Sequence, residues 1–164
     1  MYIIKEVIIM KKIIFLVTCS IVISIFAFIS AEQVTRTATI VEIEGIVEVK
    51  TPDAEDPVPA SVGMVLEESD IIATKDDSSA IIEISGSQGN AKVDLKDNSQ
   101  VVILDLIKRD TGEEETLLDL AVGKLLIKVD KMPDEKSKFE VKTPTSVVGV
   151  RGTKFSVEVE AVEE

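Results

Sequence analysis

The sequence lacks histidine and tryptophan, and its only cysteine and only tyrosine, Cys19 and Tyr2, lie close to the amino terminus. The rest of the chain therefore offers neither an imidazole nor a thiol. This excludes zinc sites built from cysteine and histidine, Ser-His-Asp triads, cysteine nucleophiles and disulfides within the main part of the chain. Only carboxylates, amines, guanidinium groups and hydroxyls remain for chemistry.

The acidic residues form short clusters, among them Asp76-Asp77 and Glu113–Glu115. None of these clusters has the spacing of an EF-hand calcium loop, with its glycine and its distal glutamate. Nothing in the sequence points to a pair of catalytic carboxylates either. We therefore expect a protein that is not an enzyme, with no catalytic residue, no metal site and no cofactor.

Basic residues are also scarce, with 18 Lys and Arg against 30 Asp and Glu, so the formal net charge is -12 at pH 7. A protein that binds nucleic acid needs a basic surface to neutralise phosphates, and we expect no nucleic-acid partner here. The negative charge keeps the protein soluble and favours cationic partners or counter-ions.

One long apolar run interrupts this charged composition near the amino terminus, at residues 13–30. Lys11-Lys12 precede it, and Ala31 follows it. A basic flank, an apolar core and a small residue at the exit are typical of a secretory signal. The sequence therefore predicts that residues 1–31 are a signal peptide or, if uncleaved, a membrane anchor in the form of one hydrophobic helix.

Translation begins at Met1 or at Met10, because Met10 directly precedes the basic pair of the leader. In both cases the basic flank stays inside and residues 32–164 are exported. We expect the protein to be extracytoplasmic, in the periplasm or at the cell surface. It is either secreted or held at the inner membrane, and it touches the membrane only through residues 13–30 if the leader is retained.

Residues 32–164 are predicted to form one all-β domain, because apolar residues alternate with polar ones and no amphipathic helix is evident. Two internal echoes support this prediction. The segment from Lys75 to Ile82 is similar to the one from Lys96 to Ile103, each a polar turn followed by an apolar strand. A second similarity links the segments that begin at Gly45 and Gly123. Such repeats are typical of β-solenoid rungs or stacked hairpins.

The most informative stretch runs from Phe139 to Val159. Pro144 cannot donate to a ladder and marks a break or an edge. Inward positions are even-numbered at Val150 but odd-numbered from Phe155 onwards, so the alternation slips by one residue between them. We expect a β-bulge or a tight kink at Gly149–Gly152 that absorbs this slip.

The segment Thr143-Pro-Thr-Ser-Val-Val-Gly-Val-Arg-Gly-Thr-Lys-Phe155 resembles the closing signature of the FecR domain family. The resemblance implies a twisted β domain that is solenoid-like or sandwich-like. The residues that carry the signature, with a structural or partner-binding role, are Thr143, Pro144, Val150, Arg151, Gly152, Thr153 and Phe155. Arg151 either locks the bulge by pairing with a carboxylate or presents a cation to a partner.

The best-known proteins similar to this one are extracytoplasmic sensors that relay a signal to a sigma factor through a cytoplasmic domain. Only residues 1–12 precede the apolar run here, so we expect no such relay within the chain. We therefore expect a non-catalytic interaction module that binds another envelope protein or a glycan, through a sheet edge or the Gly149–Gly152 kink. The alternative is the sensory subunit of a split signalling system that controls a sigma factor through a separate partner.

Overall fold

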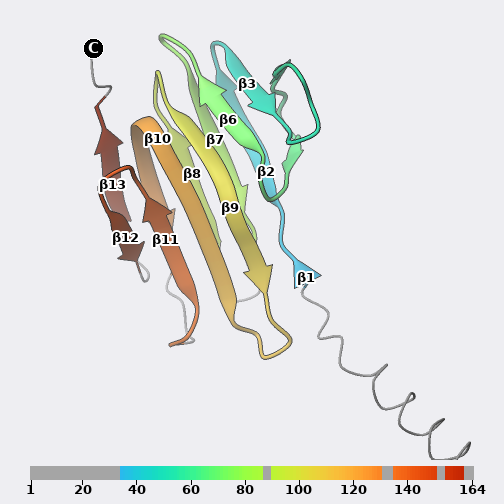
Figure 1. Ribbon diagram of the computed structural model, residues 1–164, viewed down its shortest axis with the longest axis vertical. Helices are drawn as coiled ribbons and strands as arrows, with labels where there is room; N and C mark the ends of the chain where they lie inside the picture. Colours follow the sequence, from blue (N-terminus) through green and yellow to red (C-terminus); the bar gives the residue numbers. More distant parts are fainter. Residues whose placement is uncertain (1–33, 87–89, 131–134, 151–153, 161–164) are drawn as a thin grey trace, which may run out of the picture. The chain divides into compact units, whose positions relative to one another are not determined.

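A computed structural model describes residues 34–86, 90–130, 135–150 and 154–160 (Figure 1). All regular elements within these ranges are strands, so the all-β prediction is confirmed. None of the described residues forms a helix long and apolar enough to cross a membrane. The predicted leader, residues 1–31, lies outside the described residues.

The described residues form 13 strands in one sheet. In chain order they are β1 (Val34–Thr35), β2 (Ala38–Glu44), β3 (Val47–Lys50), β4 (Val58–Pro59), β5 (Val65–Leu66), β6 (Ile71–Thr74), β7 (Ser79–Ile84), β8 (Ala91–Leu95), β9 (Gln100–Lys108), β10 (Glu114–Val129), β11 (Lys138–Lys142), β12 (Val147–Val150) and β13 (Lys154–Val159).

The sheet bends at β10, the longest strand, which has 16 residues. The part before Gly123 pairs with β9 and, in parallel, with β11, whereas the part from Gly123 onwards pairs with β8 and β13. We call the part of β10 before Gly123 the first arm, together with β1, β3, β4, β6, β9, β11 and β12. The second arm consists of the rest of β10 with β2, β5, β7, β8 and β13. The sequence leaves a solenoid-like and a sandwich-like arrangement open; the structure is a single sheet curled into an open half-barrel (Figure 1).

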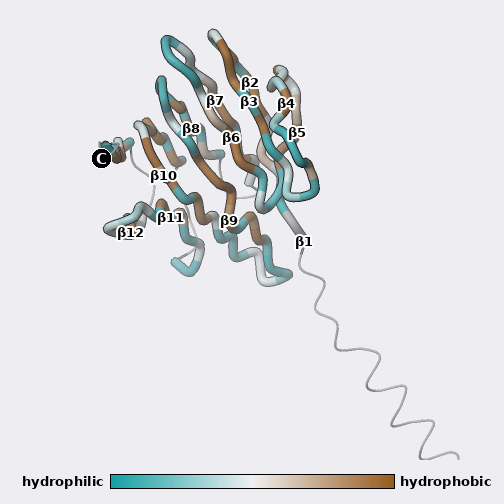
Figure 2. Tube along the Cα trace, turned by 45° about the horizontal axis from the view of Figure 1, so that its top comes forward, coloured by the Kyte–Doolittle hydropathy of each residue, from teal (hydrophilic) through white to brown (hydrophobic). Residues whose placement is uncertain are grey.

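The core lies between the two arms, because the inward residues of both arms belong to one buried cluster. Burial alternates along the strands, as in β7 and β8, so every second side chain is buried in the core and shielded from water. Hydrophobic residues accordingly line the strands, while the turn between β6 and β7 is hydrophilic (Figure 2). Fully buried large side chains include Ile40, Ile72, Leu95, Ile103, Leu120, Leu125 and Ile127.

The chain passes repeatedly from one arm to the other at the same end of the sheet, the upper end in Figure 1. These crossings lie at Gly45, at Lys75–Ser78, at Lys96–Ser99 and at Gly123. Each contains a residue with a left-handed backbone: Gly45 (φ 73°), Asp77 (49°), Asn98 (50°) and Gly123 (96°). The repeated segments of the sequence are therefore crossings that stack beside one another.

Serine hydroxyls join these crossings in pairs. The Ser78 hydroxyl accepts a hydrogen bond from the Ile46 amide at 2.9 Å, directly after Gly45, and the Ser99 hydroxyl accepts one from the Lys124 amide at 2.9 Å, directly after Gly123. The Asn98 side-chain amide donates to the Asp76 carboxylate at 2.8 Å and links the two middle crossings. This ladder fixes the bend that holds the two arms together.

Candidate functional site at an open sheet edge

The signature segment begins with a hairpin formed by β11 and β12, in which Phe139 pairs with Val150 and Lys142 with Val147. Its turn is closed by Thr143. The Thr143 amide donates to the Ser146 carbonyl at 2.8 Å, and the Thr143 hydroxyl accepts from the Ser146 amide at 3.1 Å. Pro144, which has no amide hydrogen to satisfy, lies within the turn. The predicted break in the strand is confirmed.

The register determines which backbone groups of β12 face away from β11. Residues of an antiparallel pair alternate between hydrogen-bonded and non-hydrogen-bonded positions. The Thr143–Ser146 bond sets this alternation and directs the amide and carbonyl groups of Val148 and Val150 towards β11. The corresponding groups of Val147 and Gly149 therefore point to the other side of β12. Within the described ranges, β12 pairs with β11 alone.

The residues of this open edge are apolar and uncharged. Val147 is 60% exposed, and Gly149 is also exposed, whereas Val148 and Val150 are half-buried on the inner face. The other strands at the ends of the sheet are protected in ways that prevent edge-to-edge pairing. β1, β4 and β5 have 2 residues each, and β4 contains a proline. β13 carries exposed charges at Lys154 and Glu158.

The described signature residues lie in the hairpin, except for Phe155, which lies in β13. Thr143 is buried in the turn, Pro144 lies in the turn, and Val150 and Phe155 pack against the core. The burial pattern also confirms the slip in alternation, because inward positions are even-numbered in β12 and odd-numbered in β13. β12 belongs to the first arm and β13 to the second, so the chain changes arms between them. The predicted bulge itself, with Arg151, Gly152 and Thr153, lies outside the described residues.

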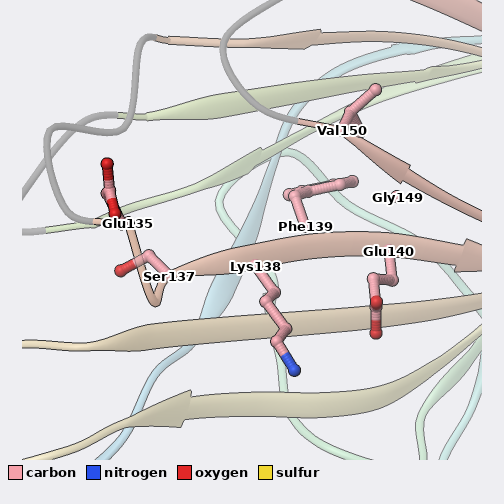
Figure 3. Close-up of a pocket in the computed structure, with 7 residues that line it drawn as sticks. All are labelled: Glu135, Ser137, Lys138, Phe139, Glu140, Gly149 and Val150. Atoms are coloured by element: carbon pink, nitrogen blue, oxygen red, sulfur yellow. The ribbon is translucent and has the colours of Figure 1, made fainter.

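A cavity of about 300 Å³ lies beside the hairpin (Figure 3), lined by Glu135, Ser137, Lys138, Phe139, Glu140, Gly149 and Val150. Lys138 and Glu140 project from one side of β11, and Phe139 projects from the other (Figure 3). Glu140 lies directly opposite Gly149. A Cβ atom added at Gly149 would be 3.8 Å from the Glu140 side chain, so the absence of a side chain leaves a notch over the open strand.

A larger groove of about 690 Å³ separates the turn of the hairpin from the end of β13, with Ala121 and Val122 of β10 between them. β11 pairs with β10 only up to Asp119, and β13 pairs with it only from Gly123 onwards. The groove therefore marks the place where the two arms separate. No group of acidic side chains in the described ranges is arranged to hold a metal ion.

A buried ion pair ties the start of the domain to β10. The Arg36 guanidinium lies 3.8 Å from the Glu114 carboxylate, and its side chain is 9% exposed. It also donates to the Ser85 carbonyl and the Thr116 hydroxyl. Burial lowers the pKa of Arg36, and the charge of Glu114 opposes that shift. Since no buried side-chain polar atom in the described ranges lacks a hydrogen-bond partner, we assign this cluster a structural role, which could not be predicted from local sequence.

Comparison with protein families matches residues 70–163 to the family described as FecR protein. The chain belongs to the FecR family. The match spans the stacked crossings from β6 onwards and the whole signature hairpin, so the resemblance found in the sequence is confirmed. Searches of curated proteins and of solved structures returned no match to this FecR-family chain.

Proposed function

We propose that this FecR-family protein is a non-catalytic, extracytoplasmic interaction module that binds an extended segment of another envelope protein along β12. The observation that carries this proposal is the uncharged edge formed by Val147–Val150, which pairs with no second strand in the described part of the chain. FecR domains occur in cell-surface signalling regulators of the cell envelope, which fits this location. An edge strand of this kind is a template for another strand.

Binding would proceed by strand addition, in which main-chain hydrogen bonds supply affinity and alternate side chains supply specificity. The outward amide and carbonyl groups of Val147 and Gly149 are the donors and acceptors for the incoming strand. Each such bond contributes about 1 kcal/mol net. Burial of the exposed Val147 side chain adds a hydrophobic contribution.

A protein segment suits this edge better than a glycan does. Sugars are commonly held on exposed aromatic rings, and the described part of the chain has only Phe139 and Phe155 as aromatic residues. Phe139 is buried at 1% exposure, and Phe155 packs against the core. Neither ring offers a flat exposed surface, whereas the outward amide and carbonyl groups of β12 pair with no second strand in the described part of the chain.

The sensory subunit of a split signalling system is the second candidate. It is favoured by membership of a family known from cell-surface signalling regulators. In that case the segment added to β12 belongs to a transporter or to an inner-membrane regulator, and the separate partner controls the sigma factor. The two candidates share one binding surface and differ only in the protein that is bound.

A single proline substitution tests strand addition. Gly149→Pro removes an outward amide without removing a bond to β11, because proline is tolerated on an edge whose amide faces solvent. Gly149→Ala is the matched control, since it keeps the amide and its Cβ meets only ordinary contacts. A photo-crosslinking residue at Val147 (60% exposed) reports partner binding in intact cells, and the same residue at Val62 (63% exposed) reports non-specific encounters.

We expect a crosslinked protein from position 147, but not from position 62, that persists in Gly149→Ala and disappears in Gly149→Pro. Equal crosslinking from both positions, or crosslinking indifferent to the proline, would contradict binding at this edge. Mass spectrometry of the product then separates the candidates. A transporter or inner-membrane regulator would identify a sensory subunit, whereas a wall-associated protein would identify an accessory envelope module.

A further inference from the structure

The two residues of β12 whose backbone groups face outward, Val147 and Gly149, have different side-chain neighbours on β11. On the outer face of the hairpin, Val147 lies opposite Lys142 and Gly149 lies opposite Glu140. Lys142 is already engaged, because its ammonium group lies 3.1 Å from the Asp119 carboxylate. A strand added to β12 therefore meets an exposed valine at one position and a notch backed by a glutamate at the other.

Glu140 is an unpaired carboxylate in the described part of the chain, where it has neither a hydrogen bond nor an ion pair. The other cation of the same face, Lys138, lies two residues earlier in β11, beyond the level at which Gly149 and Val147 face an added strand. Lys138 and Glu140 project from the same side of β11 (Figure 3), and no ion pair joins them in the described part of the chain. The charge of Glu140 is thus available to a partner.

The notch at Gly149 makes Glu140 reachable from the added strand. Neighbouring strands lie about 4.8 Å apart, so a partner residue opposite Gly149 starts about 10 Å from the backbone of Glu140. Only a long side chain can span that distance, together with the glutamate that extends towards it. The aliphatic stem of Arg or Lys would lie over Gly149 and place its charge at the carboxylate.

We infer that the segment bound at β12 carries an arginine or lysine opposite Gly149 and, two residues later, a β-branched residue opposite Val147. This inference rests on the strand addition proposed above and specifies its partner. The order of the two residues follows from antiparallel addition, and the pairing of Val147 with a β-branched side chain is a favourable cross-strand contact. Acidic segments are disfavoured by Glu140 and by the net charge of -12.

Short capped peptides test the inference directly. Each has an alternating threonine and valine frame, with a valine two residues after a central arginine, norleucine or glutamate. Binding to the full chain in mild detergent is followed by fluorescence anisotropy. We expect the arginine peptide to bind about threefold tighter than the norleucine peptide, as an exposed ion pair allows, and the glutamate peptide to bind more weakly still.

Two substitutions test whether the preference for the arginine peptide depends on the Glu140 carboxylate and on the notch at Gly149. Glu140→Gln should abolish the advantage of arginine, and Gly149→Val should do the same by filling the notch while keeping the backbone amide. The advantage should also decrease at high salt, because the pair is exposed. The norleucine peptide serves as the internal control, since its binding depends on the edge but not on Glu140.

The outcomes separate this inference from the function on which it rests. Equal affinity of the arginine, norleucine and glutamate peptides for the wild-type chain would contradict the inference that the partner carries a basic residue opposite Gly149. It would not contradict strand addition. The same holds if the preference for arginine survives Glu140→Gln. If no peptide binds, or if binding is unchanged in Gly149→Pro, strand addition at β12 is wrong and the inference is wrong with it.

Discussion

Substitution of Gly123 by alanine should be among the most damaging single changes to this fold. Gly123 is the point at which β10 passes from the first arm to the second, and its φ of 96° is rarely adopted by other residues. A Cβ atom there would overlap with Ser99 Oγ and Cα and would lie 2.6 Å from the Asn98 carbonyl oxygen. Two of these three atoms belong to the backbone of the neighbouring crossing, so they cannot move aside easily.

The cost has two parts that a matched control separates. The left-handed backbone costs a residue with a Cβ about 1–2 kcal/mol, and the overlap adds about 1–3 kcal/mol of overpacking. Gly112 has nearly the same backbone, with φ 87°, but an added Cβ meets nothing within 4 Å. Gly112→Ala should therefore cost only the first part, and Gly123→Ala should cost about 2–5 kcal/mol.

Urea unfolding of both variants, followed by far-ultraviolet circular dichroism, measures the two free energies of unfolding. Ser99→Gly removes one of the overlapping atoms but also the hydrogen bond to the Lys124 amide, so it is measured alone as a reference. In that background Gly123→Ala should cost less than in the wild-type chain but should still cost stability, because the overlap with backbone remains. The reasoning fails if Gly123→Ala is no less stable than Gly112→Ala. If Gly123→Ala costs nothing in the Ser99→Gly background, the Ser99 side chain alone, and not the close approach of backbones, causes the loss.

Two further substitutions test separate parts of the domain. Glu114→Gln leaves the charge of Arg36 buried without its counter-charge and should lower the free energy of unfolding by about 3 kcal/mol. The control Glu158→Gln, at the exposed pair with Lys124, should change the free energy of unfolding by about 0.5 kcal/mol or less. Similar losses in the two variants would contradict the role of burial. Arg151→Ala should lower the melting temperature sharply if Arg151 pairs with a carboxylate within the fold. Unchanged stability combined with loss of crosslinking from position 147 would instead assign Arg151 to partner binding.

Much of the fold could be predicted from local sequence because its local signals agree with one another. Alternating burial in β7, β8 and β11 reproduces the alternation of apolar and polar residues. Asp77 and Asn98 adopt left-handed backbones at turns, as these residue types do more readily than others. The similarity of the segments around them reflects the shared geometry of the crossings, in which Ser78 and Ser99 play equivalent roles.

The pairing of distant strands could not be predicted in the same way, because periodicity does not identify the partner of a strand. β10 reads as a charged segment followed by two apolar ones, yet it is a single strand that serves both arms. Its parallel pairing with β11 leaves no local signature. The contact between Arg36 and Glu114 depends on the same long-range arrangement. The candidate role of Glu140 could not be predicted either, because it depends on the register that places Glu140 opposite Gly149.

The exposed, uncharged edge of β12 contrasts with the edges of the other terminal strands of the sheet. An exposed apolar edge promotes aggregation, and this protein shortens, charges or interrupts its other terminal strands. The described signature residues Thr143 and Pro144 build the turn that presents β12, but they do not line its open side. The residues that would select a partner are Val147, Gly149 and Glu140. The residues that shape the hairpin are therefore distinct from the residues that would contact the partner. Substitutions among the contact residues alone could change the partner without changing the fold.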